Sequence, residues 1–331
     1  MLPPLTAELV DRQLGLATRR QLLDGGVTTA QIRWAVGRRW RVVLPGVLLL
    51  DGGLPSTQQR LIAALLLAGP DSWLAGPTAA ALHGLPGCRV TPPVHVLVPP
   101  HRTTRTVGWV RISRSYLLDE RLVSQGPLRI SCRPRALVDA AAASPDDAEV
   151  RALFIDAIHS RLVRLDDVAH WIEARESSGR LRLRRALAEA ATGVWSVPEA
   201  DLMRLVAADG RLPEPWANPT LRDAAGRRLT TPDLWFDDVA LAVMVHSRRF
   251  HAGALDWEAT VTDDEDLRSA GIEVVTVTPV TIASQPDHVL ERVFGAYLRA
   301  RGRLRPIHIA AERRHLTWGV AGAALVAANE S

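Results

Sequence analysis

Arginine side chains gather near the amino terminus of the chain. Residues 19–41 contain six arginines and a single acidic residue, Asp24, so this stretch carries a local charge of +5, whereas the whole chain of 331 residues carries +4. The guanidinium group is a planar fork of donors that suits phosphate oxygens and guanine edges. These residue types at this density indicate contact with nucleic acid. The six are Arg19, Arg20, Arg33, Arg38, Arg39 and Arg41.

Short helices would position these arginines. A first helical pattern covers Thr6–Leu14, and a second begins at Thr18 and ends at Gly25–Gly26, a glycine pair suited to a left-handed helix end. A third pattern covers Ala30–Arg38, with Thr28 or Thr29 as its cap. Two helices joined by so short a glycine turn are typical of a helix-turn-helix.

A hairpin and an exposed helix face complete this predicted domain. β-Rich segments on either side of Pro45–Gly46 predict the wing of a winged helix-turn-helix over residues 1–53. On a helical wheel, Ile32, Ala35 and Val36 share the face that packs on the second helix, and the opposite face carries no acidic residue. The residues expected to contact DNA are Arg19, Arg20, Thr28, Thr29, Gln31, Arg33, Trp34, Arg38, Arg39 and Arg41.

The composition is that of a folded, multidomain protein. With 47% apolar and 23% charged residues, the chain can build a core, and 331 residues are too many for one ordinary domain. All 40 basic residues are arginines, a usage typical of a GC-rich, actinobacterial genome. Cys88 and Cys132 lack metal-ligand spacing and are expected to be buried thiols. The chain shows no export signal, and its longest apolar tail, Leu316–Ala328, is too short to span a bilayer, so we expect a cytoplasmic protein without membrane contact.

The order of predicted elements indicates an α+β multidomain fold. Residues 54–145 mix helices and short strands, and residues 146–195 form a helical connector. Residues 196–300 follow the order helix, antiparallel strand pair, helix, strand, helix, which is typical of an α/β domain. Residues 301–331 are expected to be an irregular tail.

Residues 15–50 resemble the N-terminal domain of the AbiEi family, the antitoxins and transcriptional regulators of type IV toxin–antitoxin systems. The shared pattern is a short second helix, a glycine turn, an arginine-rich helix and a closing Gly46-Val47-Leu48, in which Leu48 replaces the family's tyrosine. Residues 76–87 and 133–141 resemble the family's second domain. The resemblance covers about residues 10–143 and implies a DNA-binding regulator with a cognate toxin as partner.

Residues 196–279 resemble another family, the restriction-endonuclease-like (PD-(D/E)xK) domain that actinobacteria often fuse to AbiEi-type heads. The matching segments include Ser196–Glu199, Pro232–Trp235, Val243–Ser247 and Thr276–Pro279. The resemblance implies Mg²⁺ held by Asp233 and by an acid on the next strand. Met244 replaces that acid, His246 replaces the following aspartate, and the chain has no lysine to orient a water molecule. A thioether is a poor ligand for a hard cation, so we expect an inactive nuclease fold without a cofactor.

A histidine pattern keeps an active alternative open. Asp233, His246 and His251 follow an Asp-x12-His-x4-His spacing, which is similar to the very-short-patch mismatch-repair endonucleases of the same fold. Those enzymes use one aspartate, a backbone carbonyl and a histidine pair, which implies a catalytic role for both histidines here and an added acid from Glu199. Histidines can perform acid–base chemistry near neutral pH. The competing interpretation is that His246 and His251 are ordinary surface or hydrogen-bonded histidines.

The sequence therefore predicts a transcriptional regulator of the antitoxin type that binds double-stranded DNA, with paired half-sites suited to a homodimer. The first alternative is a metal-dependent DNA endonuclease, with Mg²⁺ on Asp233, that the winged helix targets. The second alternative is an antitoxin that neutralises a toxin by protein–protein contact.

Overall fold

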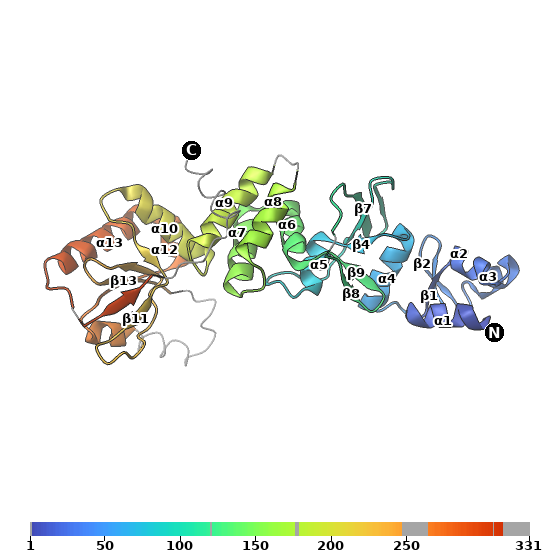
Figure 1. The fold of residues 1–331 in the computed structure, drawn as a ribbon, viewed down its shortest axis with the longest axis horizontal. Helices are drawn as coiled ribbons and strands as arrows, with labels where there is room; N and C mark the ends of the chain where they lie inside the picture. Colours follow the sequence, from blue (N-terminus) through green and yellow to red (C-terminus); the bar gives the residue numbers. More distant parts are fainter. Residues whose placement is uncertain (1, 120, 176–178, 247–263, 307, 314–331) are drawn as a thin grey trace. The chain divides into compact units, whose positions relative to one another are not determined.

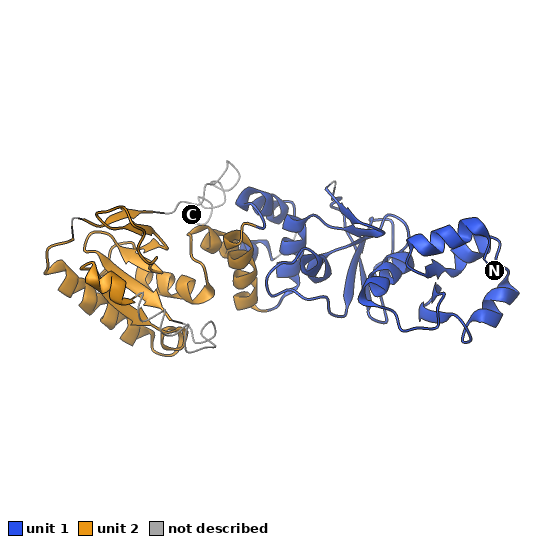
Figure 2. Cartoon of the chain, turned by 90° about the horizontal axis from the view of Figure 1, so that it is seen from below, with its two compact units in different colours: residues 1–145, 162–183 blue, residues 146–161, 184–331 orange. Residues whose placement is uncertain are grey.

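The computed structural model describes residues 2–119, 121–175, 179–246, 264–306 and 308–313. The chain is a mixed α/β protein with two compact units, unit 1 (residues 1–145 and 162–183) and unit 2 (residues 146–161 and 184–331; Figure 2). The helical segment 146–195 is therefore shared between the units. Across the described ranges, no helix has the length and apolar character needed to cross a membrane.

Unit 1 begins with short helices packed on a small sheet (Figure 1). The elements are α1 (Pro4–Arg12), β1 (Leu16–Thr18), α2 (Arg19–Asp24), α3 (Thr29–Ala35), β2 (Arg41–Leu44) and β3 (Val47–Leu49). The strands pair antiparallel in the order β1-β3-β2. Thr18 and Thr28 open α2 and α3 with capping boxes, and the side chains of Leu22 and Ile32 on these helices are fully buried in one core cluster.

Helix α3 ends three residues earlier than the sequence predicts. Its last residue is Ala35 because Gly37 has a φ of +79° and the chain turns back after it. The backbone N–H groups of Arg38, Arg39 and Trp40 all donate to the carbonyl oxygen of Ala35. Arg38 and Arg39 therefore lie in a turn between α3 and β2 rather than on the helix.

The rest of unit 1 is a mixed sheet with helices. The elements are α4 (Thr57–Ala68), β4 (Trp73–Leu74), α5 (Gly76–Leu82), β5 (Val94–Val98), β6 (Arg105–Val107), β7 (Val110–Arg114), β8 (Val123–Gln125), β9 (Leu128–Ile130), α6 (Arg133–Ala143) and α8 (Leu165–Glu173). The strand order is β6-β7-β5-β4-β9-β8. β5 and β7 pair in parallel, with His95 opposite Arg111. Cys132 is buried, and burial raises the pKa of its thiol to about 11, whereas Cys88 is half-buried.

Unit 2 is built on a sheet of strand order β10-β12-β13-β14. β10 pairs antiparallel with β12 and β12 with β13, whereas β13 and β14 are parallel and joined through helical residues 264–269. The elements are α7 (Asp147–His159), α9 (Arg180–Ala191, with its first residues in unit 1), α10 (Val197–Asp209), β10 (Trp216–Ala217), β11 (Thr220–Arg222), β12 (Leu234–Phe236), β13 (Leu241–Val245), β14 (Glu273–Val277), α12 (Pro279–Ser284), α13 (Pro286–Arg301) and β15 (Ala310–Glu312). α10, the antiparallel pair β12–β13, helical residues 264–269, β14 and α13 follow the predicted order, whereas β10, β11 and α12 were not predicted, and residues 247–263 lie outside the described residues.

Apolar layers cover both faces of this sheet. Leu234, Phe236 and Val243 pack with residues of α10 and α13, which lie beside the sheet in Figure 1. Trp235 and Met244 point to the opposite face and pack with Leu267 and with residues near β11 and β15. β15 pairs antiparallel with β11, so residues 310–312 of the predicted irregular tail form a strand.

Candidate functional site

The ten residues expected to contact DNA are all exposed in the structure. They lie on α2, on α3, in the turn after α3 and at the start of β2. No carboxylate in the described part of the chain lies within ion-pair distance of Arg19 or Arg33. Arg20 pairs with Asp24 at 3.6 Å, but both side chains are highly exposed, so the pair adds little stability. The arginine face, as we call these ten residues, therefore leaves most of its donors open to a partner.

An aromatic ring orders two of the arginines. The guanidinium groups of Arg38 and Arg39 lie 5.7 and 5.3 Å from the ring centroid of Trp34, and Arg38 also donates to the Trp34 carbonyl oxygen at 2.9 Å. Trp34 is 53% exposed, which is high for the largest apolar side chain. Cation–π contacts restrict the guanidinium groups without neutralising them. The turn thus presents two preoriented cations beside α3.

Two predicted contact residues already have a structural role. The Thr28 hydroxyl oxygen accepts the backbone N–H of Gln31 at 3.2 Å, and the Gln31 side-chain oxygen accepts the backbone N–H of Thr28 at 2.8 Å. These bonds satisfy donors at the start of α3. The amide nitrogen of Gln31 takes no part in this cap. Thr28 and Gln31 therefore fix where α3 begins, and Gln31 keeps a donor that can reach a ligand.

A second candidate site in unit 2 holds three carboxyl groups. Glu199 is buried at the start of α10, where it accepts hydrogen bonds from the Trp195 N–H (2.7 Å), the Ser196 hydroxyl (2.7 Å) and the Asn218 amide (2.9 Å). Both oxygens of Glu199 are thus engaged by donors from its own helix end and from a neighbouring loop. This carboxylate therefore has a structural role at the start of α10, where Ser196 is the N-cap.

Asp233 comes directly before β12 and is partly buried. Its Oδ2 accepts the backbone N–H of Val245 at 2.5 Å. Burial raises the pKa of Asp233 to about 8, and the negative charges of Glu199 and Asp264 contribute to the increase. The carboxyl group is therefore mostly protonated at neutral pH.

The sequence did not predict a role for Asp264. Its Oδ2 lies 3.2 Å from Nε2 of His246 and accepts the Thr276 hydroxyl at 2.9 Å. Burial raises the pKa of Asp264, but the hydrogen bonds from His246 and Thr276 outweigh burial and hold this pKa below its usual value. Its Oδ1 is buried without a hydrogen-bond partner among the described residues. His246 is thus paired with an ionised aspartate, while His251 lies outside the described residues.

The described side chains around Asp233 do not by themselves form a Mg²⁺ site. In the described ranges, no three side chains of the His, Cys, Asp or Glu type are placed to hold a metal ion. Both oxygens of Glu199 accept N–H or O–H donors, and the raised pKa of Asp233 favours its protonated form. On β13, Met244 pairs with Thr276 of β14 and offers a thioether instead of a carboxylate. Mg²⁺ is usually bound by one or two ionised carboxylates together with water or phosphate oxygens, whereas Asp233 favours its neutral form and the oxygens of Glu199 are already engaged.

Comparisons with known proteins identify no family. No protein-family model matches the chain, and no curated protein sequence matches it. One similar solved structure is the crystal structure of the RV2827C protein from Mycobacterium tuberculosis. It has 15% sequence identity and a TM-score of 0.40, over 56% of this chain and 75% of that chain.

Proposed function

We propose that this chain is a DNA-binding regulator of the AbiEi antitoxin type, whose unit 2 has a nuclease-like fold that does not cut. The observation that carries the proposal is the arginine face, where none of the described carboxylates lies within ion-pair distance of Arg19 or Arg33. Exposed guanidinium groups on and beside the short helices α2 and α3 are suited to contact phosphates and base edges. The proposed domain is a winged helix-turn-helix over residues 1–53, with α3 in the major groove.

The position of the hairpin supports this docking mode. The backbone N–H of Arg19 donates to the carbonyl oxygen of Gly46 at 2.8 Å, so the β2–β3 turn is tied to the start of α2. Arg41 opens β2 and donates to the Gly52 carbonyl oxygen at 3.4 Å. The backbone of Arg19 and the side chain of Arg41 are therefore both tied to the hairpin segment, which keeps these two residues near the proposed wing.

Salt-dependent binding of the full chain to duplex DNA tests the proposal. Fluorescence anisotropy with labelled duplexes should give an affinity that falls steeply with salt, because phosphate contacts release counterions. Arg33→Ala should weaken binding by about 1–3 kcal/mol if the side chain reaches a base edge. Arg12→Ala is the matched control, since Arg12 is an exposed arginine on α1 that pairs with Glu8. The absence of binding at low salt, or equal losses in both variants, would contradict the proposal.

The antitoxin role makes a further demand on the DNA. An autoregulator should protect paired half-sites, one or more helical turns apart, in its own upstream region, as expected for a homodimer. Footprinting should therefore show periodic protection, and protection without a pattern would indicate a non-specific architectural role. A chain that lacks DNA affinity but copurifies with a toxin encoded next to it would instead favour an antitoxin that acts by protein contact.

The endonuclease alternative rests on Asp233 and on the His246–Asp264 pair. An imidazole oriented by an ionised aspartate could act as a general base. A cleavage assay on supercoiled and mismatched DNA, with Mg²⁺ or Mn²⁺, separates this alternative from the proposal. We expect no cleavage. Metal-dependent cutting that Asp233→Ala and His246→Ala both abolish would favour the endonuclease.

A further inference from the structure

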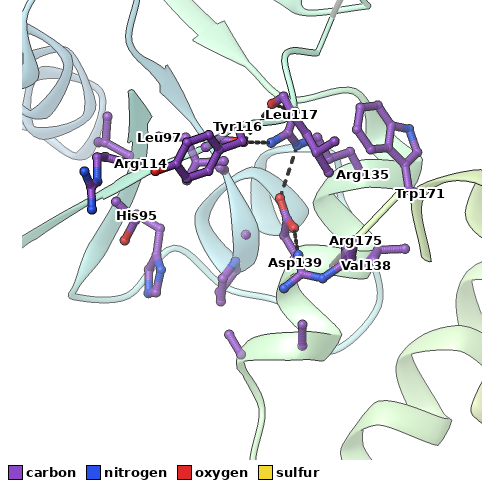
Figure 3. A pocket seen from close by; sticks show the side chains of 18 of the residues that line it. His95, Leu97, Arg114, Tyr116, Leu117, Arg135, Val138, Asp139, Trp171 and Arg175 are labelled. Carbon is purple, nitrogen blue, oxygen red and sulfur yellow. Dashed lines mark hydrogen bonds and ion pairs between the residues drawn. The ribbon is translucent and has the colours of Figure 1, made fainter. Parts of the chain in front are cut away.

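A large cavity opens in unit 1, away from the arginine face. It has a volume of about 960 Å³ and lies between strands β5 and β7 and helices α6 and α8. Pockets that hold small ligands range from about 300 to 1,000 Å³. Figure 3 shows His95 and Arg114 at one side of this cavity and Arg135, Asp139 and Arg175 at the other. The cavity is therefore large enough for a nucleotide-sized molecule.

One wall of the cavity is a fixed ionic cluster. Arg135 donates to Asp139 across 3.4 Å, to the Ser115 hydroxyl at 2.8 Å and to the Leu117 carbonyl oxygen at 2.9 Å, and only 4% of its side chain is exposed. Arg175 pairs with the other oxygen of Asp139. Two cations thus enclose a single carboxylate, which leaves this wall with a positive charge. The hydrogen bonds of Arg135 are all made within the protein, but its positive charge still attracts anions in the cavity.

Two donors in the α8 wall are left without acceptors. Nε1 of Trp171 and Nε of Arg175 are buried and have no hydrogen-bond partner in the part of the chain that the structure describes. Only 6% of the surface of Trp171 is exposed. Buried donors without acceptors cost stability, and such groups often mark the place of a water molecule or a ligand. Both nitrogens are enclosed by protein, so they add polarity to this wall but are not open to the cavity.

The opposite wall carries open cations. Arg111 and Arg114 on β7 are both exposed, and no carboxylate among the described residues lies within ion-pair distance of either. Burial lowers the pKa of His95, and the charge of Arg111 lowers it further, so His95 is neutral at pH 7. Among the described lining residues, four guanidinium groups face one carboxylate. The cavity as a whole therefore favours an anion.

We propose that this cavity binds a small phosphorylated molecule, a nucleoside phosphate. Guanidinium groups match phosphate oxygens in geometry and charge, which assigns the phosphate to Arg111 and Arg114. Tyr116 lines the cavity with 76% of its surface exposed, and in Figure 3 its ring lies between Arg114 and Arg135. An exposed aromatic ring beside cations is suited to stack on a planar base. A concave site of this size fits a mononucleotide rather than a duplex.

Isothermal titration of the full chain with ATP, pyrophosphate and adenosine tests the proposal. We expect ATP to saturate one site, pyrophosphate to bind more weakly, and adenosine to bind at least about tenfold more weakly than ATP because it lacks the charge-assisted contacts. Arg111→Ala and Arg114→Ala should each weaken ATP binding about tenfold or more. Tyr116→Ala should weaken ATP binding and leave pyrophosphate binding unchanged.

Two control variants separate this site from other cationic surfaces. Arg89→Ala removes an exposed arginine of unit 1 that does not line the cavity, and Arg33→Ala removes one from the arginine face. Neither should change ATP affinity, and circular dichroism should show that all variants fold. ATP binding that is absent, or that survives both Arg111→Ala and Arg114→Ala, would overturn the proposal. A single-stranded 12-mer that binds more tightly than ATP and loses affinity in the same variants would replace the small ligand with nucleic acid. These outcomes do not depend on whether the arginine face binds duplex DNA.

Discussion

Replacing Asp233 with asparagine should stabilise the protein, and the gain should grow with pH. The unfolded chain ionises this carboxyl group near about pH 4, whereas the folded chain keeps it protonated until about pH 8. Because the folded-state pKa is raised, the contribution of Asp233 to stability is complete below about pH 4 and is lost as the pH rises through about 8. Asparagine keeps an oxygen that can accept the Val245 N–H and carries no charge. The free energy of unfolding of the Asp233→Asn variant should therefore not fall between pH 4 and pH 8 for this reason.

The size of the effect follows from the difference between the two pKa values. A difference of about four units corresponds to roughly 6 kcal/mol as an upper bound, at about 1.4 kcal/mol per unit. Asp233 is only partly buried, and part of its raised pKa comes from the charge of Glu199, so solvent screening and relaxation reduce that figure. We expect Asp233→Asn to raise the free energy of unfolding by about 2 kcal/mol at pH 8 and by close to zero at pH 4.

Urea denaturation followed by circular dichroism, between pH 4 and pH 9, measures this difference. Asp266→Asn is the matched control, because it makes the same chemical change at an exposed aspartate of unit 2. It should give a small, pH-independent change. Repeating the series with millimolar MgCl₂ should leave every value unchanged. A variant that is less stable than the native chain at pH 8 would refute the reasoning about burial. Stabilisation by Mg²⁺ of the native chain, and not of Asp233→Asn, would refute the inactive-nuclease proposal.

Two further changes test the structural roles of single side chains. Thr28→Ala removes the cap of α3 and should cost about 1 kcal/mol in urea denaturation; an unchanged midpoint would mean that the capping box adds nothing. Arg135→Met leaves Asp139 buried with Arg175 as its remaining ion-pair partner among the described residues, and should cost about 3–5 kcal/mol. The double variant with Asp139→Asn should recover part of that loss, and no recovery would show that Arg135 acts through packing alone.

The helices of residues 1–53 could be predicted because their signals are local. Threonine caps and glycine turns act within four residues, so sequence alone places the start of α2 and places the start of α3 to within one residue, because Thr28 and Thr29 both remained possible caps. The end of α3 could not be placed in this way, because a lone glycine such as Gly37 is tolerated inside many helices. Its positive φ depends on the return of the chain into β2. β1 escaped prediction for a related reason, since its three residues gain their strand character by pairing with β3.

The candidate site of unit 2 could likewise be predicted only in part. Glu199, Asp233 and His246 were identified from a family resemblance, and the structure brings the charges of Glu199 and Asp233 close enough to interact. Asp264 sits in an acidic run that looks like an ordinary solvated helix start. Its burial follows from helix phase, because Asp264 lies one turn before Leu267, which is fully buried against the sheet. That spacing is the signal that would have singled it out.

Residue type alone cannot say what an arginine does in a chain whose 40 basic residues are all arginines. The surroundings decide it. Arg135 is almost fully enclosed and opposed by Asp139, so its removal should affect stability. Arg33 is exposed, and no carboxylate in the described ranges lies within ion-pair distance of it, so its removal should leave stability nearly unchanged and affect binding. Arg38 combines both conditions, because Trp34 orients its guanidinium group while its charge stays uncompensated. A cation that is held in place and has no carboxylate beside it among the described residues can bind an anion from outside the chain, and this is the physical basis for the proposal that the arginine face binds DNA.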